Sequence, residues 1–165
     1  MTEYNDFYEC EKPLTPADIG YVEEELSIKF SDDFKKHYLK FNGGTPKNTI
    51  WVDVFGKYDD REVRDFIPIL YHEAFENDPS FTLDGRVKEE WSNAEVPKNL
   101  IPFAFDWVGN YFCLDHFNQK IYYFIRDVWS DNLTQDQNFK VNSVFLCDTF
   151  ERFVQSLVFN DEEDA

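Results

Sequence analysis

Basic residues are scarce in this chain: 16 lysines and arginines stand against 33 aspartates and glutamates, which gives a formal net charge of −17. The negative charge is spread along the sequence instead of being confined to one tail. It disfavours nucleic acid and anionic membranes as partners, because both repel an acidic surface. The balance is typical of a protein with solvated acidic faces, or of one whose field steers a basic partner.

Cysteine is also sparse, and the chain has no long apolar run. Cys10, Cys113 and Cys147 are odd in number, widely spaced and without a CxxC pair, so neither a disulfide framework nor a zinc site is predicted. The opening residues show no secretion signal, and no segment approaches the roughly 18 to 20 apolar residues that span a bilayer. We expect a cytoplasmic protein with three free thiols.

Catalytic signatures are lacking as well. The chain contains no GxSxG, Walker, GxGxxG, HExxH or EF-hand pattern, and its three histidines, His37, His72 and His116, are scattered. Adjacent acids such as Asp32-Asp33 and Asp59-Asp60 are expected by chance among so many carboxylates, and adjacency in sequence does not bring groups together in space. The sequence therefore predicts a protein without enzymatic activity, cofactor or metal.

Aromatic residues are abundant, at 19% of 165 residues, and supply an ample core for one domain. We expect a single domain over residues 1–165, with an irregular lead-in at 1–13 and an acidic tail at 160–165. Strand-like and helix-like segments are both present without repeats. An α+β fold is predicted, in which N-terminal helices and a C-terminal helix flank a central antiparallel sheet.

The most strand-like stretch is residues 101–128. Two aromatic and β-branched runs, 110–117 and 120–128, flank a polar pair, which predicts a hairpin at the centre of the sheet with Asn118 at positive φ. Alternation gives each run one apolar face and one mixed, partly exposed face. Before the hairpin, Gly109 interrupts the pattern within residues 106–110, where a bulge or sharp turn is expected.

Helix signals open and close the chain. Thr15 with Asp18 predicts a capping box, and Ser31 begins a second helix that ends at Asn42-Gly43-Gly44 in left-handed conformation. Asp148 is expected to cap a last helix.

Other segments carry weaker signals. Residues 49–55 read as a strand with Ile50, Val52 and Val54 inward. Residues 141–146 read as a short strand and 130–138 as a polar loop, whereas 56–99 predict no definite elements.

Three stretches together resemble a known family: LTPADIGYVEEELSIKFSDDFKKHYLKFNGGTP, NLIPFAFDWVGNYFCLD with KIYYFIRD, and VNSVFLCDTFERFVQSLV. Their order is similar to the Smi/Knr type of the SUKH superfamily, which has an acidic first helix, a second helix ending in Asn-Gly-Gly, a Gly-Asn strand ending in Leu-Asp, and a closing helix with spaced phenylalanines. The chain departs from this pattern at Ser31, where the family commonly has proline. The likeness covers about two-thirds of the chain.

The resemblance implies a compact non-catalytic α+β domain. Most bacterial members are implied to be immunity proteins that bind and neutralise a cognate toxin, often a nuclease. A nuclease is basic where it holds phosphates, so an inhibitor at −17 would meet it with complementary potential. The alternative is an acidic regulatory or scaffold module, as implied by fungal relatives in cell-wall signalling.

Partner contacts are expected where large rings stand beside polar groups on the outer face of the sheet and at the bend before the hairpin, because interface energy concentrates in such anchors. Tryptophans are also frequent in cores, and that alternative remains open for Trp51 and Trp107. The candidate partner-binding residues are Trp51, Asp53, Asp59, Asp60, Asp106, Trp107, Asn110 and Asp115.

Overall fold

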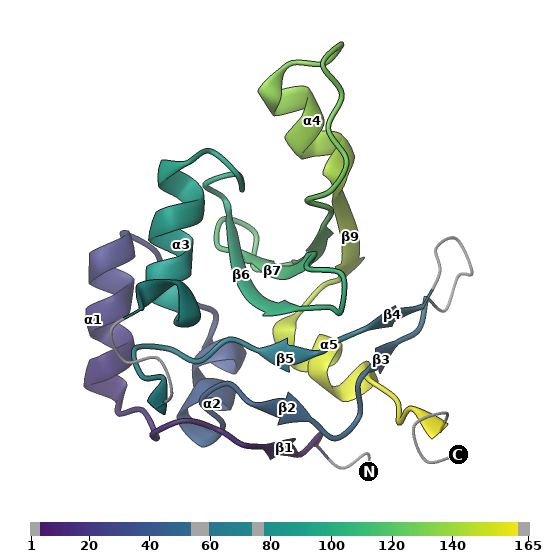
Figure 1. The fold of residues 1–165 in the computed structure, drawn as a ribbon. Helices are drawn as coiled ribbons and strands as arrows, with labels where there is room; N and C mark the ends of the chain where they lie inside the picture. Colours follow the sequence, from purple (N-terminus) through teal and green to yellow (C-terminus); the bar gives the residue numbers. More distant parts are fainter. Residues whose placement is uncertain (1–3, 54–59, 74–77, 162–165) are drawn as a thin grey trace.

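A computed structural model describes residues 4–53, 60–73 and 78–161. Within these residues, antiparallel strands form a five-stranded main sheet, and helices flank it, so the predicted α+β fold is confirmed. The strand order is β5 (Asp65–Phe66), β6 (Leu100–Phe105), β7 (Tyr111–Asp115), β8 (Ile121–Phe124) and β9 (Ser143–Cys147). Helices α2 (Asp32–Lys40) and α5 (Phe150–Ser156) pack beneath the sheet, α1 (Pro16–Leu26) stands beside α3 (Leu83–Ser92), and α4 (Gln135–Asn142) rises away from the body (Figure 1).

The two N-terminal helices begin where the sequence predicts. Helix α1 spans Pro16–Leu26, and its N-cap Thr15 accepts from the backbone of Asp18 while the Asp18 carboxylate accepts from the backbone of Thr15. Helix α2 spans Asp32–Lys40 after the N-cap Ser31, whose side chain makes no capping hydrogen bond. The capping box therefore fixes the first helix, while the second is held mainly by its buried aromatic stripe.

The two glycines of the Asn-Gly-Gly segment after α2 have the predicted left-handed backbone. Gly43 and Gly44 have φ of 76° and 94°. A Cβ added at Gly43 would lie 2.8 Å from the backbone nitrogen of Pro68, and one at Gly44 would lie 2.5 Å from the carbonyl oxygen of Tyr8. Both glycines are therefore required by close backbone contacts as well as by conformation.

The predicted hairpin is the centre of the sheet. Strand β7 (Tyr111–Asp115) pairs with β8 (Ile121–Phe124) on one side and with β6 (Leu100–Phe105) on the other. The turn residue with positive φ is Gln119, at 64°, and the prediction of Asn118 is wrong. The Asn118 side chain instead accepts a hydrogen bond from the backbone N–H of Lys120 at 2.9 Å, which leaves the left-handed position to its neighbour.

Both faces of the hairpin are covered. Phe112, Leu114 and Ile121 face the main core, whereas Tyr111 and Cys113 join a second apolar cluster. The expectation of a partly exposed second face is wrong for β7, which is buried along its length. Trp91 of α3 and Phe139 of α4 pack against that second cluster.

The main core is built from rings contributed by α2, β5, β6, β7 and α5. Phe34 of α2 meets Phe150 of α5 at a ring-centroid distance of 4.7 Å, and the hydroxyl of Tyr38 donates to the carbonyl of Ile67 at 2.8 Å. The largest fully buried rings of this core are Phe34, Tyr38, Phe66, Phe103, Phe112, Phe150 and Phe153, and the second cluster contains two more, Tyr111 and Phe124.

Two short ribbons flank the sheet. Strand β1 (Phe7–Tyr8), in the segment expected to be irregular, pairs with β2 (Thr45–Pro46), and β3 (Ile50–Trp51) pairs with β4 (Arg61–Glu62). Of the strand predicted over residues 49–55, only Ile50–Trp51 is strand among the described residues, and Val54 and Phe55 lie outside them.

The inward and outward faces of β3 are also reversed. Trp51 is 7% exposed and part of the core, whereas Val52 is 38% exposed. Strand β3 is not part of the main sheet: Ile50 pairs with Glu62 and bridges to Val158, and this places the ring of Trp51 against the core.

Several elements replace segments read as loop or left unassigned. Strand β5 (Asp65–Phe66), the 3-10 helix η2 (Pro79–Phe81) and α3 (Leu83–Ser92) lie within residues 56–99. Helix α4 (Gln135–Asn142) begins inside the expected loop 130–138, with a capping box at Thr134 and Gln137, and extends over the first two residues of the strand predicted at 141–146, so both predictions are wrong there. No described helix is long and apolar enough to cross a lipid bilayer.

The last strand and helix are close to their predicted positions. Strand β9 spans Ser143–Cys147, and α5 spans Phe150–Ser156. The N-cap of α5 is Thr149, whose hydroxyl accepts from the backbone N–H of Arg152 at 3.1 Å, so the prediction of Asp148 is wrong by one residue.

Candidate partner-binding site

The turn between β6 and β7 is held by one buried carboxylate. One oxygen of Asp106 accepts hydrogen bonds from the backbone N–H groups of Val108 at 3.0 Å and Asn110 at 2.9 Å. Gly109 completes the turn with φ of 92°, which confirms the sharp turn predicted there. The turn is therefore rigidly specified by its own side chains.

A second set of contacts ties the turn to the sheet. The hydroxyl of Tyr123 donates a short hydrogen bond to the other oxygen of Asp106 and accepts one from the Asn110 side-chain amide at 3.0 Å. The amide oxygen of Asn110 accepts from the backbone N–H of Arg126 at 2.8 Å. Burial, and then the hydrogen bond to Asp106, raise the pKa of Tyr123, so its hydroxyl stays a donor.

Trp107 stands at the tip of this turn and is 61% exposed. Its indole N–H donates to one carboxylate oxygen of Glu62 at 2.7 Å, and the side-chain amide of Asn160 donates to the other at 2.6 Å. The guanidinium of Arg64 lies 4.9 Å from the centroid of the Trp107 ring. A large ring is thus exposed and held in one orientation, which is how an interface anchor is pre-organised.

Other apolar side chains are exposed on the elements joined to this ring. Val108 follows Trp107 and is 74% exposed, and Val52 is 38% exposed beyond β3. Val158, which bridges to β3, and Phe159 are 46% and 45% exposed. We call Trp107, Val108, Glu62, Arg64 and Asn160 the Trp107 face.

The sequence-predicted residues divide between this face and other places. Trp107 is exposed, and the expectation that it could belong to the core is not met. Asp106 and Asn110 lie beside it but are 9% and 6% exposed, so they position the turn instead of offering contacts. Asp60 is exposed directly before β4, and Asp53 is half-buried two residues after Trp51.

Two of the expected residues are not on the face, and a third is not among the described residues. Trp51 is a core residue, as described above. Asp115 is 6% exposed at the opposite end of β7, where it accepts hydrogen bonds from the backbone of Phe117 at 2.8 Å and the side chain of Asn99 at 2.9 Å. Asp59 lies outside the described residues.

Sequence reasoning missed Glu62, Arg64 and Asn160. Glu62 lies 45 residues before Trp107 and Asn160 lies 98 residues after Glu62, so no local pattern connects them. The local sequence contains one signal, in which the charged residues Glu62 and Arg64 flank the apolar Val63. This alternation of polar and apolar residues is too short to identify a strand.

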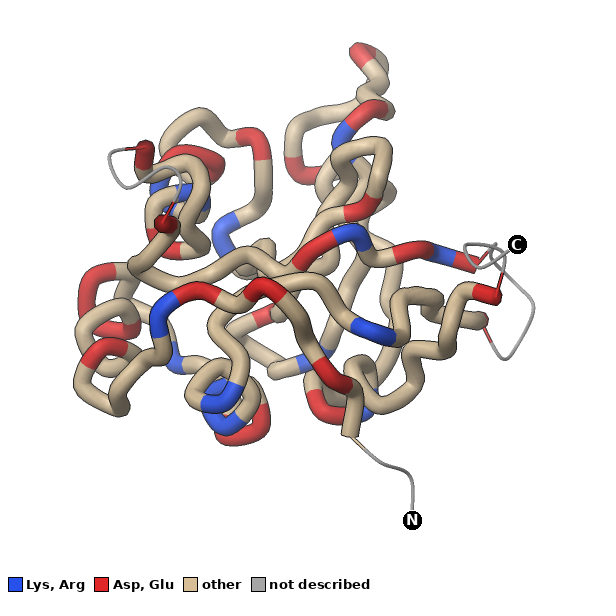
Figure 2. Tube along the Cα trace, turned by 60° about the horizontal axis from the view of Figure 1, so that its bottom comes forward, with Lys and Arg blue, Asp and Glu red and all other residues tan. Residues whose placement is uncertain are grey.

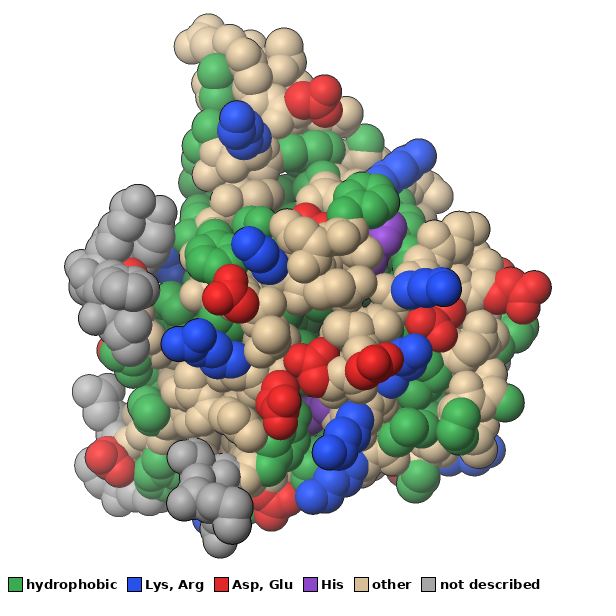
Figure 3. Space-filling model, turned by 180° about the vertical axis from the view of Figure 1, so that it is seen from behind, with side chains coloured by type: hydrophobic (Ala, Val, Ile, Leu, Met, Phe, Trp, Pro, Cys, Tyr) green, Lys and Arg blue, Asp and Glu red, His purple; other side chains and the backbone are tan. Residues whose placement is uncertain are grey.

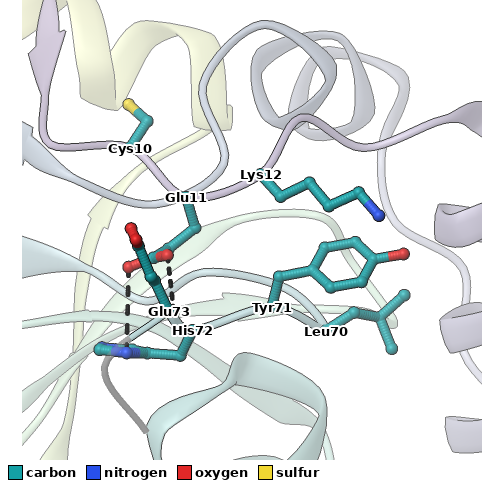
Figure 4. A pocket seen from close by; sticks show the side chains of 7 residues that line it. All are labelled: Cys10, Glu11, Lys12, Leu70, Tyr71, His72 and Glu73. Carbon is teal, nitrogen blue, oxygen red and sulfur yellow. Dashed lines mark hydrogen bonds and ion pairs between the residues drawn. The ribbon is translucent and has the colours of Figure 1, made fainter. Parts of the chain in front are cut away.

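A hollow of about 490 Å³ lies elsewhere on the surface, between residues 10–12 and 70–73 (Figure 4). Glu11 accepts from the backbone N–H of Glu73 at 2.9 Å and lies 3.9 Å from the ring of His72, while Lys12 covers the ring of Tyr71 at 4.6 Å.

The thiol beside this hollow is not an activated nucleophile. Cys10 donates to the carbonyl of Gly43 at 3.4 Å, and burial, followed by Asp6 and Glu11, raises its pKa. A thiolate is the reactive form of cysteine, and these surroundings disfavour it. All three cysteines are free, as predicted.

His37 is a core histidine. It is 3% exposed and shares a hydrogen bond with the hydroxyl of Tyr4 at 2.7 Å. Burial, with a smaller contribution from Lys40, lowers its pKa to about 3. Among the described residues, no group of three or more His, Cys, Asp or Glu side chains could hold a metal ion.

The low pKa of His37 predicts a specific acid sensitivity. Because the ordinary pKa is 6.5, the unfolded chain binds a proton first as pH falls, so stability drops below about pH 6.5. The expected slope reaches about 1.4 kcal/mol per pH unit. Urea unfolding between pH 7 and pH 5, a range above the pH at which most carboxylates titrate, measures this slope. The variant His37→Phe should have a flatter pH dependence of its unfolding free energy. The same slope in both proteins would contradict the role given to His37.

Comparison with known families identifies the chain. Residues 13–156 match the model of the SMI1/KNR4 family (SUKH-1), and the chain belongs to this family. The family supports an immunity-type or regulatory domain. No curated protein matches the sequence.

Proposed function

We propose that the chain is an immunity protein that binds a cognate toxin domain through the Trp107 face and neutralises it without catalysis. The observation that carries this proposal is Trp107 itself, 61% exposed yet fixed by Glu62 and Arg64. A single exposed ring is common on protein surfaces. The indole N–H and one ring face of Trp107 are already engaged, so its side chain has lost the conformational freedom that it would otherwise lose on binding. Membership of the SMI1/KNR4 family supports an immunity-type or regulatory domain, and the proposal takes the first of these.

Charge supports a basic nuclease as the toxin. Acidic residues are distributed over the described trace and outnumber the basic ones (Figure 2). From behind, charged side chains of both signs are scattered over the middle and lower surface, with hydrophobic side chains between them (Figure 3). A field spread over the whole molecule attracts a basic domain from a distance, while the Trp107 face decides how it docks.

Co-expression tests the function. The toxin domain encoded next to this chain should kill or arrest cells alone and be tolerated when the chain is present, and purified chain should inhibit its nuclease activity at one-to-one ratio. Binding without any effect on toxicity would favour the regulatory or scaffold alternative. Absence of both binding and protection would contradict the proposal.

Electrostatic steering predicts a charge-reversal effect on association. Asp60→Lys should slow association with the toxin, and the defect should shrink toward 1 M salt, where the Debye length is about 3 Å. Glu24 is exposed on α1, and Glu24→Lys changes the net charge by the same amount, so it serves as the control, with a smaller effect expected. Stopped-flow measurement checks both; a defect that persists unchanged at high salt would remove the steering argument.

A further inference from the structure

Arginine is distributed unevenly over this acidic molecule. The chain has five arginines, and four of them lie against aromatic rings around the β6–β7 turn. The fifth, Arg152, is exposed on α5. Three of the four alternate with rings in one connected series, which we call the arginine–aromatic ladder: Trp107, Arg64, Phe105, Arg86, Tyr111 and Arg126.

Shared rings make the ladder continuous. The guanidinium of Arg64 lies 4.9 Å from the Trp107 ring and 5.7 Å from the Phe105 ring. Arg86 lies 5.7 Å from the same Phe105 ring and 5.9 Å from the Tyr111 ring. Phe105 and Tyr111 are cross-strand partners in β6 and β7, so the sheet itself sets the spacing.

The far end of the ladder is equally ordered. Arg126 lies 4.4 Å from the Tyr111 ring and donates to the carbonyl of Gly109 at 3.1 Å. The turn that carries Trp107 is thus joined to both ends of the ladder. The N–H donors of a guanidinium lie in its own plane, so packing its face against an aromatic ring leaves them directed outward. This pre-organises the guanidinium for a planar anion.

The arginines at the two ends retain donors for a ligand. The side chains of Arg64 and Arg126 are 48% and 35% exposed. Their carboxylate neighbours lie at 3.6 Å (Asp65) and 3.5 Å (Glu90), longer than charged hydrogen bonds of about 2.7 to 2.9 Å. With five donors on each guanidinium, capacity remains for a second carboxylate.

We propose that the arginine–aromatic ladder is a docking site for an acidic peptide segment of a partner protein. Carboxylates of the segment would pair with Arg64 and Arg126, and its apolar atoms would lie on Trp107. Two ends with free donors, separated by a row of rings, favour an extended segment over a single small anion. The ladder gathers three of the five arginines of a chain of net charge −17, and the donors that Asp65 and Glu90 leave unused call for a carboxylate even if the partner is basic overall.

Nucleic acid fits the ladder less well. Single strands bind by stacking bases on open aromatic faces beside a basic groove. Here guanidiniums lie over the rings of Phe105 and Tyr111, and Tyr111 is 2% exposed. A long polyanion would also meet the repulsion of the whole acidic surface.

A peptide titration tests the ladder without any toxin. The proposed function can therefore fail while this inference holds, and this inference can fail while the proposed function holds. Hexaglutamate added to the full-length, ¹⁵N-labelled chain at millimolar concentration should shift the Trp107 indole and Arg64 Nε–H signals. Hexaglutamine should not. Arg64→Gln should weaken hexaglutamate binding at least tenfold, whereas Arg152→Gln, with the same loss of charge, should leave it unchanged.

Further measurements test whether the variants are correctly folded and which kind of anion binds. The backbone spectrum of Arg64→Gln must match that of the native chain, and Arg126→Lys, which keeps the charge beside Glu90 but loses the planar fork, should weaken binding several-fold. Equal binding by Arg64→Gln and Arg152→Gln, or no shifts with hexaglutamate, would overturn the proposal. Tighter binding of a six-nucleotide single strand than of hexaglutamate would overturn it in favour of a nucleic-acid ligand.

Discussion

Replacing Trp107 by alanine is expected to weaken binding of the cognate toxin domain by about 2 kcal/mol or more, roughly 30-fold, the loss typical of an interface hot spot. The folded state should barely change, because the ring is 61% exposed and gives up one hydrogen bond, to Glu62. The expected fall in unfolding free energy is under about 1 kcal/mol. Calorimetric titration and urea unfolding measure the two quantities.

A matched control is available at the other end of the hairpin. Phe117 is 77% exposed in the β7–β8 turn, so Phe117→Ala removes an exposed ring of similar kind away from the Trp107 face. It should leave toxin affinity within about twofold of the native value, as most residues outside a hot spot do. Equal losses for the two variants, or destabilisation of Trp107→Ala by about 3 kcal/mol as for a core ring, would remove Trp107 from the proposed site.

Replacing Asn42 by alanine is expected to lower the free energy of unfolding by about 3 kcal/mol or more. Asn42 is 2% exposed, and its amide nitrogen donates to the carbonyls of Lys12 at 2.9 Å and Ile69 at 3.0 Å. Its amide oxygen accepts from the backbone N–H of Ile69 at 2.7 Å. Alanine leaves three backbone groups without these partners, each at about 1 to 3 kcal/mol when buried.

Thermal and urea unfolding check this prediction against Asn118→Ala. Asn118 also makes backbone and side-chain hydrogen bonds, but it is exposed to water, so its loss should cost under about 1 kcal/mol. For a chain of this size, the Asn42 variant should melt about 6 °C or more lower. A melting temperature equal to that of the Asn118 variant would mean that water replaces the amide, and Asn42 would then not be the link between these segments.

Features that depend on neighbouring residues could be predicted from the sequence. The capping box at Thr15 and Asp18 completes itself within one turn, and the Gly43-Gly44 stop follows from conformation alone. The hairpin was predictable because β7 and β8 are adjacent in the chain. The buried asparagine contacts that make Asn42 important were not, since they join residues 27 and 30 positions away.

Features set by distant packing could not be predicted in this way. Helix α3 has its N-cap at Thr82, but it lies among charged residues with few apolar positions to mark a period. Where α4 forms, the sequence predicts a loop to residue 138 and a strand from residue 141, because two asparagines, Asn138 and Asn142, occupy the buried positions of the helix. Tertiary contacts outweighed the local pattern in both cases, as they did for Trp51.

The candidate site shows the same division. The turn at Asp106 and Gly109 follows from local chemistry, and an exposed ring at Trp107 was one of two expectations. Glu62 and Arg64 come from a segment without clear alternation, and only the folded chain brings them to Trp107. Asp115 was a candidate by residue type alone, but the fold uses it to cap the β7–β8 turn.

Hydrogen–deuterium exchange on the complex with the inactivated toxin domain tests the central claim most directly. If the toxin docks on the Trp107 face, amides of residues 61–64 and 105–110 should exchange more slowly in the complex than in the free chain. Amides of residues 116–120, in the opposite turn, should be unchanged and serve as the internal reference. Protection confined to 116–120, or to the hollow at 10–12 and 70–73, with none at 105–110, would contradict the assignment of the Trp107 face as the partner-binding site.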